Sequence, residues 1–358
     1  MKTDDERISR VPDTATEARL LAIREQAART GAVSGPGIRP AGAPFPRASM
    51  EAGYYGLPLL KKPQWTWEVP VYFFVGGAAG AAAVIAAIAG WAGAERSLVR
   101  DARKIAAAGA LLSPPLLIAD LGRPSRFYNM LRVFKPQSVM SMGAWTLSVF
   151  GPSAVASLVL ELRRDLLPKF LRQALPAVAG NVAGATGMVM ATYTGVLLGA
   201  TVAPAWNQNA GILPIHFAAS GLGSAVGMLE LMGHQENRPL QALGIAAAIV
   251  ECAVGARIER SSNPANQPLK EGASGWIVRA GGILSGPAAL FLRVASSVTG
   301  ERIAPRLRRA AALCSIAGSL LTRVGWVEAG NASSQDNRIP LALPESAQPV
   351  GTLTAGPR

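Results

Sequence analysis

The stretch VPVYFFVGGAAGAAAVIAAIAGWA, residues 69–92, contains no charged residue. A helix needs about 20 mostly apolar residues to cross the hydrocarbon core of a bilayer, so this stretch is long enough to do so. It is also rich in glycine and alanine, whose small side chains let helix backbones approach closely in lipid. Residues 69–92 therefore predict a transmembrane helix.

Comparable apolar stretches recur along the rest of the chain. We expect them to span at residues 105–121, 139–161, 175–203, 210–233, 240–258, 273–297 and 309–329. Of the 358 residues, 50% are hydrophobic and 16% are charged, whereas a soluble domain carries about 25% charged residues. No strand-like alternation is sustained. The sequence predicts an all-α membrane protein, an eight-transmembrane-helix bundle with polar N- and C-terminal tails.

The two ends of the chain differ from this central part. Residues 1–53 are rich in charge, proline and glycine and predict a disordered tail with a short helical piece near Thr14–Arg29. Residues 54–330 make up the predicted membrane domain, and residues 331–358 a second tail. The aromatic run YYGLPLLKKPQWTW, from Tyr54 to Trp67, is typical of the interface before a first span. The N-terminus has no early apolar region, so we expect no signal peptide.

The net charge of +13 comes mainly from short basic loops between the spans, which favours contact with anionic lipid over nucleic acid. On one side we count 13 basic residues: Arg96, Arg100, Arg103, Lys104, Arg163, Arg164, Lys169, Arg172, Arg238, Arg302, Arg306, Arg308 and Arg309. The side of the termini has 7: Arg123, Arg126, Arg132, Lys135, Arg257, Arg260 and Lys270. The positive-inside rule therefore places both termini outside a cytoplasmic membrane.

Residues that bind redox groups are scarce. The only two histidines, His216 and His234, are 18 residues apart, roughly 27 Å along a helix, too far to clamp one haem between them. His–Met ligation stays open as an alternative. Cys252 and Cys314 form no CxxC pair, and we interpret them as small buried residues. The sequence predicts no haem and no metal or iron–sulfur cluster bound by this chain.

Several ionisable residues fall inside predicted spans, where charge is costly and often functional. Glu230 and Glu251 lie in the fifth and sixth spans, and Arg279 and Arg293 lie in the seventh. One interpretation is that they form ion pairs between helices and anchors at the interface. The other is that Glu230, Glu251 and Arg279 line a proton path.

The linker LIADLGRPSRFYNMLRVFKPQSVMSMGAW, from Leu117 to Trp145, is too polar to span. Its alternating aromatic, basic and proline residues favour a compact, ordered loop. Two interpretations are open: a loop that contacts lipid headgroups, or a docking surface that roofs a binding site.

This linker resembles the most recognisable motif of the NrfD/PsrC family, the membrane subunits of polysulphide-reductase-type complexes. The matching residues are Asp120, Leu121, Gly122, Arg123, Pro124, Arg126, Phe127, Asn129, Met130, Leu131, Phe134, Ser138, Met140, Ser141, Gly143, Ala144 and Trp145. Further motifs follow the same family order: W-x-W…Y-x-F…G-G-x-A-G from Trp65 to Gly80, Y-T-G-V-L-L from Tyr193 to Leu198 with Pro204 and Trp206 after it, L-P-I-H-F-A-A-S-G-L from Leu213, and E-A-G-N-A-S-S-Q-D from Glu328 to Asp336.

The resemblance implies an eight-helix subunit without haem that lies under a ferredoxin-like iron–sulfur partner. That partner would serve a catalytic subunit, often a molybdopterin enzyme, as in complexes of the polysulphide reductase or formate dehydrogenase type. The subunit would bind a quinone, menaquinone or ubiquinone, at the start of the first helix. It would not be catalytically complete alone.

The family's quinone site corresponds here to Glu68 and Tyr72 as the reactive pair, with Asp120, Arg123, Arg126 and Tyr193 as further binding residues. Some members have Asn and His where this chain has Glu68 and Tyr72. Quinol oxidation releases protons and electrons, so a site needs an apolar slot, hydrogen-bond donors and an acid–base group. Glu68 would accept protons, and the two tyrosines would donate hydrogen bonds.

The sequence thus leads to one main hypothesis and two alternatives. The main hypothesis is a quinone-binding anchor that exchanges electrons between the membrane quinone pool and an iron–sulfur partner. The first alternative is a proton-translocating subunit of such a complex. The second is a secondary transporter, against which the lack of an internal repeat argues.

Overall fold

The computed structural model describes residues 60–63, 65–121, 123–336 and 339, together with Ala18, Ala22 and Glu25. The chain divides into two units, and the second, Ala52–Tyr54 with Pro58–Arg358, contains every helix bounded below. Of the helical piece expected near Thr14–Arg29, only Ala18, Ala22 and Glu25 are described, and these are helical. The rest of that piece, and most of both predicted tails, lie outside the described residues.

The structure confirms an all-α membrane bundle. Among the described residues there is no strand, and eight helices are long and apolar enough to cross a membrane. They are α2 (Glu68–Trp91), α3 (Arg96–Asp120), α4 (Val139–Leu162), α5 (Ala174–Gly199), α7 (Leu213–Leu229) continued by η3 (Glu230–His234), α8 (Arg238–Arg260), α10 (Gly272–Ile283) continued by η5 (Leu284–Ala288) and α11 (Ala289–Val298), and α12 (Ala304–Gln335).

Short elements connect these spans. They are the 3₁₀ turns η1 (Pro124–Leu131), η2 (Arg164–Leu166) and η4 (Pro264–Asn266), and the single-turn helices α6 (Pro204–Asn207) and α9 (Gln267–Lys270). The elements η3 and η5 are π-helical turns inside their spans. Such turns are uncommon and are frequent at functional sites.

Two expected spans, 105–121 and 309–329, were too short. α3 begins at Arg96 because its basic first turns stay helical, with Arg103 buried against Glu161 on α4. α12 runs from Ala304 to Gln335, so its last residues, expected in the tail, are helical and partly buried. Charged side chains at helix ends can reach water or a partner without ending the helix, so hydropathy alone underestimates its length.

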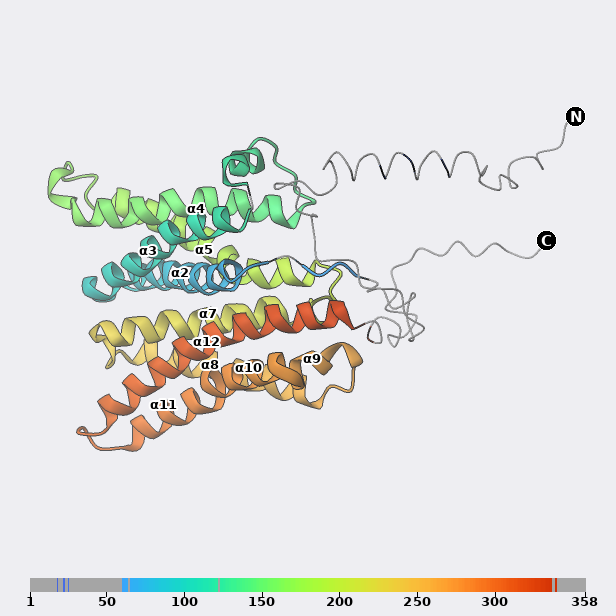
Figure 1. The fold of residues 1–358 in the computed structure, drawn as a ribbon. Coiled ribbons are helices and arrows are strands. Elements are labelled where there is room, and N and C mark those ends of the chain that lie inside the picture. Colours follow the sequence, from blue (N-terminus) through green and yellow to red (C-terminus); the bar gives the residue numbers. More distant parts are fainter. Residues whose placement is uncertain are drawn as a thin grey trace, which may run out of the picture. The chain divides into compact units, whose positions relative to one another are not determined.

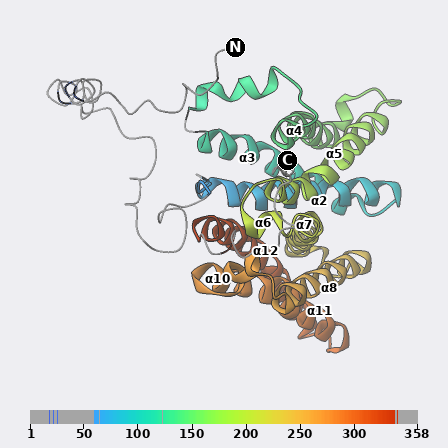
Figure 2. The ribbon, with the colours of Figure 1, turned by 90° about the vertical axis from the view of Figure 1, so that its right-hand side faces the viewer.

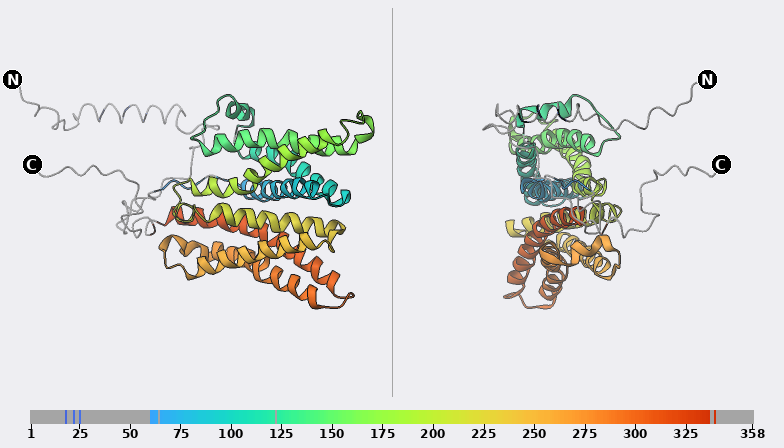
Figure 3. Two further views of the ribbon diagram at one scale, coloured as in Figure 1. Left: turned by 180° about the vertical axis from the view of Figure 1, so that it is seen from behind. Right: turned by 45° about the vertical axis from the view of Figure 1, so that its right-hand side comes forward.

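The spans form two groups that meet where α2 and α5 contact α7 and where α2 contacts α12. α2, α3, α4 and α5 pack on one another, and α7, α8, α10, α11 and α12 form the second group. Figure 1 shows the first group above the second, with α2 beside α7 at the boundary. Figure 2, turned by 90°, again places α2 between α3 and α7, and Figure 3 shows the same order from behind.

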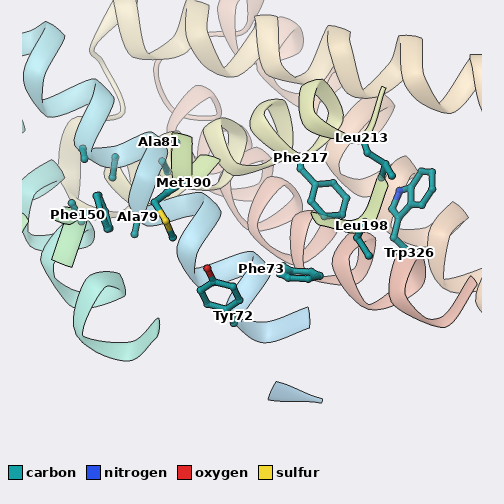
Figure 4. Packing of buried hydrophobic residues seen from close by; sticks show 14 of the residues in the cluster. Tyr72, Phe73, Ala79, Ala81, Phe150, Met190, Leu198, Leu213, Phe217 and Trp326 are labelled. Carbon is teal, nitrogen blue, oxygen red and sulfur yellow. The ribbon is translucent and has the colours of Figure 1, made fainter. Parts of the chain in front are cut away.

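Glycine permits close contact where the groups meet. A Cβ on Gly221 of α7 would lie 2.9 Å from the carbonyl oxygen of Gly77 on α2, which is the small-residue contact expected of helices packed in lipid. Aromatic side chains continue this junction toward the start of α2. Phe73 and Phe217 have ring centroids 6.3 Å apart, and Figure 4 shows Tyr72 beside Phe73. The junction is therefore tightly packed.

Candidate functional site

A cavity of about 610 Å³ lies within the first group of helices, at the end where α2 begins and α3 ends. Its lining residues are Trp65, Val69, Tyr72, Phe73, Ala110, Leu111, Pro114, Leu117, Ile118, Asp120, Leu121, Phe127, Met130, Leu131, Met140, Gly143, Ala144, Leu147, Ser148, Gly151, Pro152, Val155, Tyr193 and Leu197. Cavities of roughly 300–1,000 Å³ with mainly apolar walls and a few polar groups are typical of small-molecule sites. Size and lining therefore make this the main candidate site.

Tyr72 of α2 and Tyr193 of α5 both line this cavity. They are 2% and 7% exposed. Neither hydroxyl donates a hydrogen bond to another residue in the described part of the chain. A buried hydroxyl without a partner is costly, so both are available to donate to a bound acceptor.

Asp120 connects the end of α3 to the chain before α2. Its Oδ1 accepts hydrogen bonds from the backbone N–H and the hydroxyl of Thr66, at 3.1 and 2.8 Å. These bonds hold the neighbouring Trp65 in place, whose ring stacks on Trp206 with centroids 5.1 Å apart. Asp120 and Trp65 both line the cavity. The carboxylate thus has a structural role besides bringing an acidic group to the site.

The other predicted site residues lie around the cavity rather than in its wall. Glu68 is the first residue of α2 and does not line the cavity, although its Oε2 is buried without a partner among the described residues. Arg123 is exposed beside η1. The backbone of Arg126 belongs to η1, whereas its side chain lies outside the described residues. The structure therefore brings together Tyr72, Asp120 and Tyr193.

The predicted linker is ordered and closes the cavity at this end. Phe127, Met130 and Leu131 of η1 line the cavity, and Phe127 and Leu131 are exposed. The interpretation of the loop as the roof of a site agrees with this position. Its role as a docking surface remains a prediction.

A separate cluster of buried polar groups lies in the second group of helices. Glu251 on α8 accepts a hydrogen bond from the Ser285 hydroxyl at 2.7 Å, and its other oxygen lies 3.2 Å from Nδ1 of His216 on α7. That second contact has the distance of an ion pair without the alignment of a hydrogen bond. Ser285 belongs to the π-helical turn η5. Glu251 therefore joins three spans through polar contacts at membrane depth.

Glu230 of η3 and Arg293 of α11 form a second buried centre in the same group of helices. The Arg293 guanidinium donates to Glu230 and occupies the space left by Gly244 on α8, where a Cβ would lie 2.5 Å from it. Gly244 precedes Glu251 by seven residues, which separates the two centres by roughly 10 Å along α8. Several atoms of this pair, Glu230 Oε2 and Arg293 Nε and Nη2, lack a partner in the described part of the chain.

The remaining basic residues of the spans differ from one another. Arg279, predicted to share a proton path with Glu230 and Glu251, instead forms an ion pair with Glu259 at 2.7 Å, and both side chains are more than 40% exposed. Arg323 is fully buried, donates to the carbonyl oxygen of Phe217 at 2.8 Å and lies over the Phe217 ring. Arg279 thus belongs to an exposed ion pair, whereas Arg323 is buried against Phe217.

Metal-binding groups are not evident in the part of the chain that the structure describes. No cluster of three or more His, Cys, Asp or Glu residues suited to a metal occurs there. Cys252 and Cys314 are free thiols. His234 lies 2.9 Å from Asp101, and His216 lies against Glu251, so each histidine faces an acid on another helix.

Comparison with known proteins identifies the family. The family model described as "Polysulphide reductase, NrfD" matches residues 60–238, which is half of the chain. The chain belongs to the NrfD family. The matched residues include every residue that lines the cavity. They include His216 and Glu230 but exclude Glu251, Ser285 and Arg323. The match therefore covers the whole cavity and only part of the buried polar residues in the second group of helices.

Two relatives of this NrfD family member support the assignment. The polysulfide reductase C subunit of Wolinella succinogenes is 30% identical over 187 residues, which cover 47% of this chain and 58% of that protein. Protein NrfD of Escherichia coli is 26% identical over 199 residues, which cover 49% of this chain and 62% of that protein. The chain thus aligns with about three-fifths of each relative's length.

The sequence of this NrfD-family chain did not single out several residues of the cavity wall and of the buried contacts around Glu251. Trp65 and Gly143 belong to the family motifs, but nothing in the pattern placed them in a cavity wall. His216 was considered only as a haem ligand, although a histidine inside a span is itself a signal of polar function. Ser285 carried no signal, because serine often satisfies its hydroxyl on its own helix, as Ser285 also does with Gly281.

Proposed function

We propose that this NrfD-family chain is a quinone-binding membrane subunit of a multisubunit oxidoreductase. The observation that carries the proposal is the cavity of about 610 Å³, whose mainly apolar wall includes the two tyrosines Tyr72 and Tyr193 and the acidic residue Asp120. A quinone ring has two carbonyl acceptors on an apolar body. The cavity offers donors and an apolar slot of the matching kind.

The residues suit the proton chemistry of a quinol. A quinol that becomes a quinone gives up two electrons and two protons. Tyr72 and Tyr193 would orient the ring by donating to its oxygens, and Asp120 and Glu68 would accept protons at the end of the cavity. Arg123 and Arg126, beside the same end, would bias the charge on the ring or hold a partner subunit.

Electrons need an acceptor or donor outside this chain. We propose that a ferredoxin-like iron–sulfur subunit docks over η1 and exchanges electrons with the quinone, and that a catalytic subunit, of the molybdopterin type, completes the complex in the cytoplasmic membrane. The Wolinella relative is named as one component of a polysulfide reductase, which agrees with such an assembly for that protein. The exposed aromatic residues Phe127 and Tyr128 of η1 offer a surface for this contact.

A binding measurement tests the proposal directly. The full chain in lipid nanodiscs is titrated with a fluorescent quinol analogue, and displacement by an unlabelled quinone defines specific binding. We expect saturable binding that Tyr72→Phe and Tyr193→Phe each weaken about tenfold, the cost of one lost hydrogen bond to a buried acceptor. Tyr128→Phe is the matched control, because Tyr128 is 56% exposed and does not line the cavity. No saturable binding to the wild-type chain would refute the proposal.

Proton translocation is a second candidate function, favoured by the buried acids of the second helix group. Glu251 and Glu230 lie in spans with unpartnered polar atoms around them, and buried polar atoms of this kind usually bind water. Such water would join the two centres into a path along α8. His216 and Arg323 belong to this path by position, whereas Arg279 would act only at its outer end.

A proteoliposome assay of the assembled complex separates the two functions. We expect Glu251→Gln to stop proton movement across the membrane during turnover while quinol oxidation continues. Arg279→Gln, which breaks the exposed ion pair with Glu259, is measured beside Glu251→Gln for comparison. Proton movement that is unaffected by Glu251→Gln would exclude a path through this residue.

A further inference from the structure

A second cavity, of about 530 Å³, lies where α9, the start of α10 and the last turns of α12 come together. These three helices pack on one another, and Figure 1 shows them side by side. None of the residues that line the second cavity also lines the first. Its volume is within the range of roughly 300–1,000 Å³ that is typical of small-molecule sites. The second cavity is therefore a separate candidate site.

One face of α12 supplies polar groups to the second cavity. Glu328, Asn331 and Gln335 line it, and their spacing of three and four residues places them on the same face of the helix. Asn331 is 5% exposed, and its Oδ1 has no hydrogen-bond partner in the described part of the chain. A buried amide without a partner is costly, and a molecule that bonds to it in the cavity removes this cost.

The wall of the second cavity is acidic, although the chain has a net charge of +13. The charged residues among its described lining residues are three acids, Glu271, Glu328 and Asp336, and one base, Lys62. One oxygen of Glu271 accepts a hydrogen bond from Gln267 at 2.9 Å. Glu328 forms no ion pair in the part of the chain that the structure describes. This excess of carboxylates favours a ligand with a positively charged group.

The start of α10 adds hydrogen-bond donors to the same cavity. Gly272, Ala273 and Ser274 line it, and their backbone N–H groups have no backbone partner among the described residues. Glu271, which precedes α10, makes no capping hydrogen bond with its side chain. A Cβ added to Gly272 would meet no atom within 4 Å, so open space adjoins this turn. Free N–H groups at the start of a helix, with Lys62 nearby in the wall, favour an anionic group.

The second cavity lies at the level of lipid headgroups. The apolar stretches expected in the bilayer end at residue 329 in α12 and begin at residue 273 in α10, and the lining residues lie around these two ends. Trp276 of α10 is 72% exposed, and tryptophan is enriched at the membrane–water interface. A ligand of this cavity therefore meets both water and the edge of the hydrocarbon.

We propose that the second cavity binds the headgroup of an ethanolamine phospholipid from the surrounding bilayer. The phosphate accepts hydrogen bonds from the first N–H groups of α10 and from Lys62, and the ammonium donates to Glu328 and Asn331. A choline headgroup carries the same two charges but has no N–H to donate, so this wall distinguishes the two lipids. The proposal is independent of the quinone function.

Lipid retention by the purified full chain tests the proposal. The chain in detergent is incubated with equal amounts of dioleoyl phosphatidylethanolamine and dioleoyl phosphatidylcholine, and the bound lipid is counted by native mass spectrometry. We expect the wild type to prefer the ethanolamine lipid about tenfold, as hydrogen bonds between charged groups provide, and Glu328→Gln to reduce this preference to about twofold. Glu301→Gln is the matched control, because Glu301 is an exposed acid between α11 and α12 that does not line the cavity.

Asn331→Leu separates binding from folding. Leucine has a similar volume and removes an amide oxygen that has no partner in the described part of the chain, so the thermal midpoint without added lipid should not fall. We expect the ethanolamine lipid to raise the midpoint of the wild type and to raise that of Asn331→Leu much less. A purely structural role for Asn331 would instead lower the midpoint without lipid and leave the increase on adding lipid unchanged.

Each outcome supports or overturns the site. A preference for the ethanolamine lipid that both cavity variants reduce and Glu301→Gln retains supports it. Equal retention of the two lipids by the wild type overturns it, as does a preference that neither cavity variant alters. Soluble glycerophosphoethanolamine at the concentration of the lipid should not displace the lipid. Displacement by it would overturn the assignment to a membrane lipid in favour of a free ethanolamine phosphate.

Discussion

Gly143 of α4 lies directly against the phenol ring of Tyr193 on α5, so closely that a Cβ at position 143 would overlap the ring and its hydroxyl. Both residues line the cavity. The missing side chain at position 143 is thus what lets Tyr193 present its hydroxyl to the cavity from a neighbouring helix.

We expect Gly143→Ala to displace Tyr193 and to weaken binding of the quinol analogue to the extent that Tyr193→Phe does. Overpacking a closely packed contact costs about 1–3 kcal/mol, so the thermal midpoint of the chain should fall as well. The measurement is the analogue's Kd together with thermal unfolding in detergent.

The control for this change is Gly255→Ala on α8, where a new Cβ meets nothing within 4 Å. Alanine is the better helix former by about 1 kcal/mol, so this variant should be at least as stable as the wild type and keep its Kd. Unaltered binding in Gly143→Ala would show that the hydroxyl of Tyr193 is not positioned by this contact.

Asp120 provides a way to separate structure from chemistry. Asp120→Asn keeps an oxygen that can accept from Thr66 but removes the negative charge, whereas Asp120→Ala removes both. We expect Asp120→Ala to lower stability by about 1 kcal/mol, the net cost of a lost hydrogen bond, and Asp120→Asn to retain most of it. If Asp120 accepts protons from quinol, both variants should slow quinol oxidation by the complex. Full activity of Asp120→Asn would restrict the residue to its bonds with Thr66.

Glu68 begins α2 outside the cavity wall, and its predicted role is to accept a proton. We expect Glu68→Gln to abolish quinol-linked turnover while the complex still assembles, because glutamine can no longer accept a proton. Assembly is checked by co-purification of the subunits and turnover by quinol oxidation. Turnover equal to that of the wild type would remove Glu68 from the proton route.

The two ion pairs Glu230–Arg293 and Glu259–Arg279 differ in burial, and this difference predicts their contributions to stability. Glu230→Gln leaves the buried charge of Arg293 without its partner and should destabilise the chain by about 3–5 kcal/mol. Glu259→Gln breaks the exposed pair and should cost about 1 kcal/mol or less. Thermal unfolding of the two variants side by side provides the comparison. Similar losses for both would mean that Arg293 finds another partner or water.

The orientation of the chain in the membrane can be tested with reporters. The distribution of basic residues between the two sides places both termini outside the cytoplasm. A reporter that is active only in the cytoplasm, fused after Arg358, should therefore be inactive, and a reporter active only outside should be active. The reverse pattern would invert the membrane topology and place the Asp120 end of the cavity on the cytoplasmic side.

The sequence by itself determined the class of fold and the family. A run of about 20 apolar residues is stable across a bilayer only as a helix, because a helix satisfies its backbone hydrogen bonds internally. Hydropathy therefore predicted all eight spans. The motif from Asp120 to Trp145 likewise indicated the NrfD family, which the match to residues 60–238 confirms.

Only the tertiary structure decided which polar residues meet. Glu230, Glu251 and Arg279 looked equivalent in the sequence, yet Glu251 lies against His216, Glu230 against Arg293, and Arg279 is exposed. The rotation of each helix about its axis determines such contacts, and that rotation depends on small-residue packing with neighbouring helices rather than on local hydropathy. The same packing places Tyr193 against Gly143, which no pattern along one helix could predict.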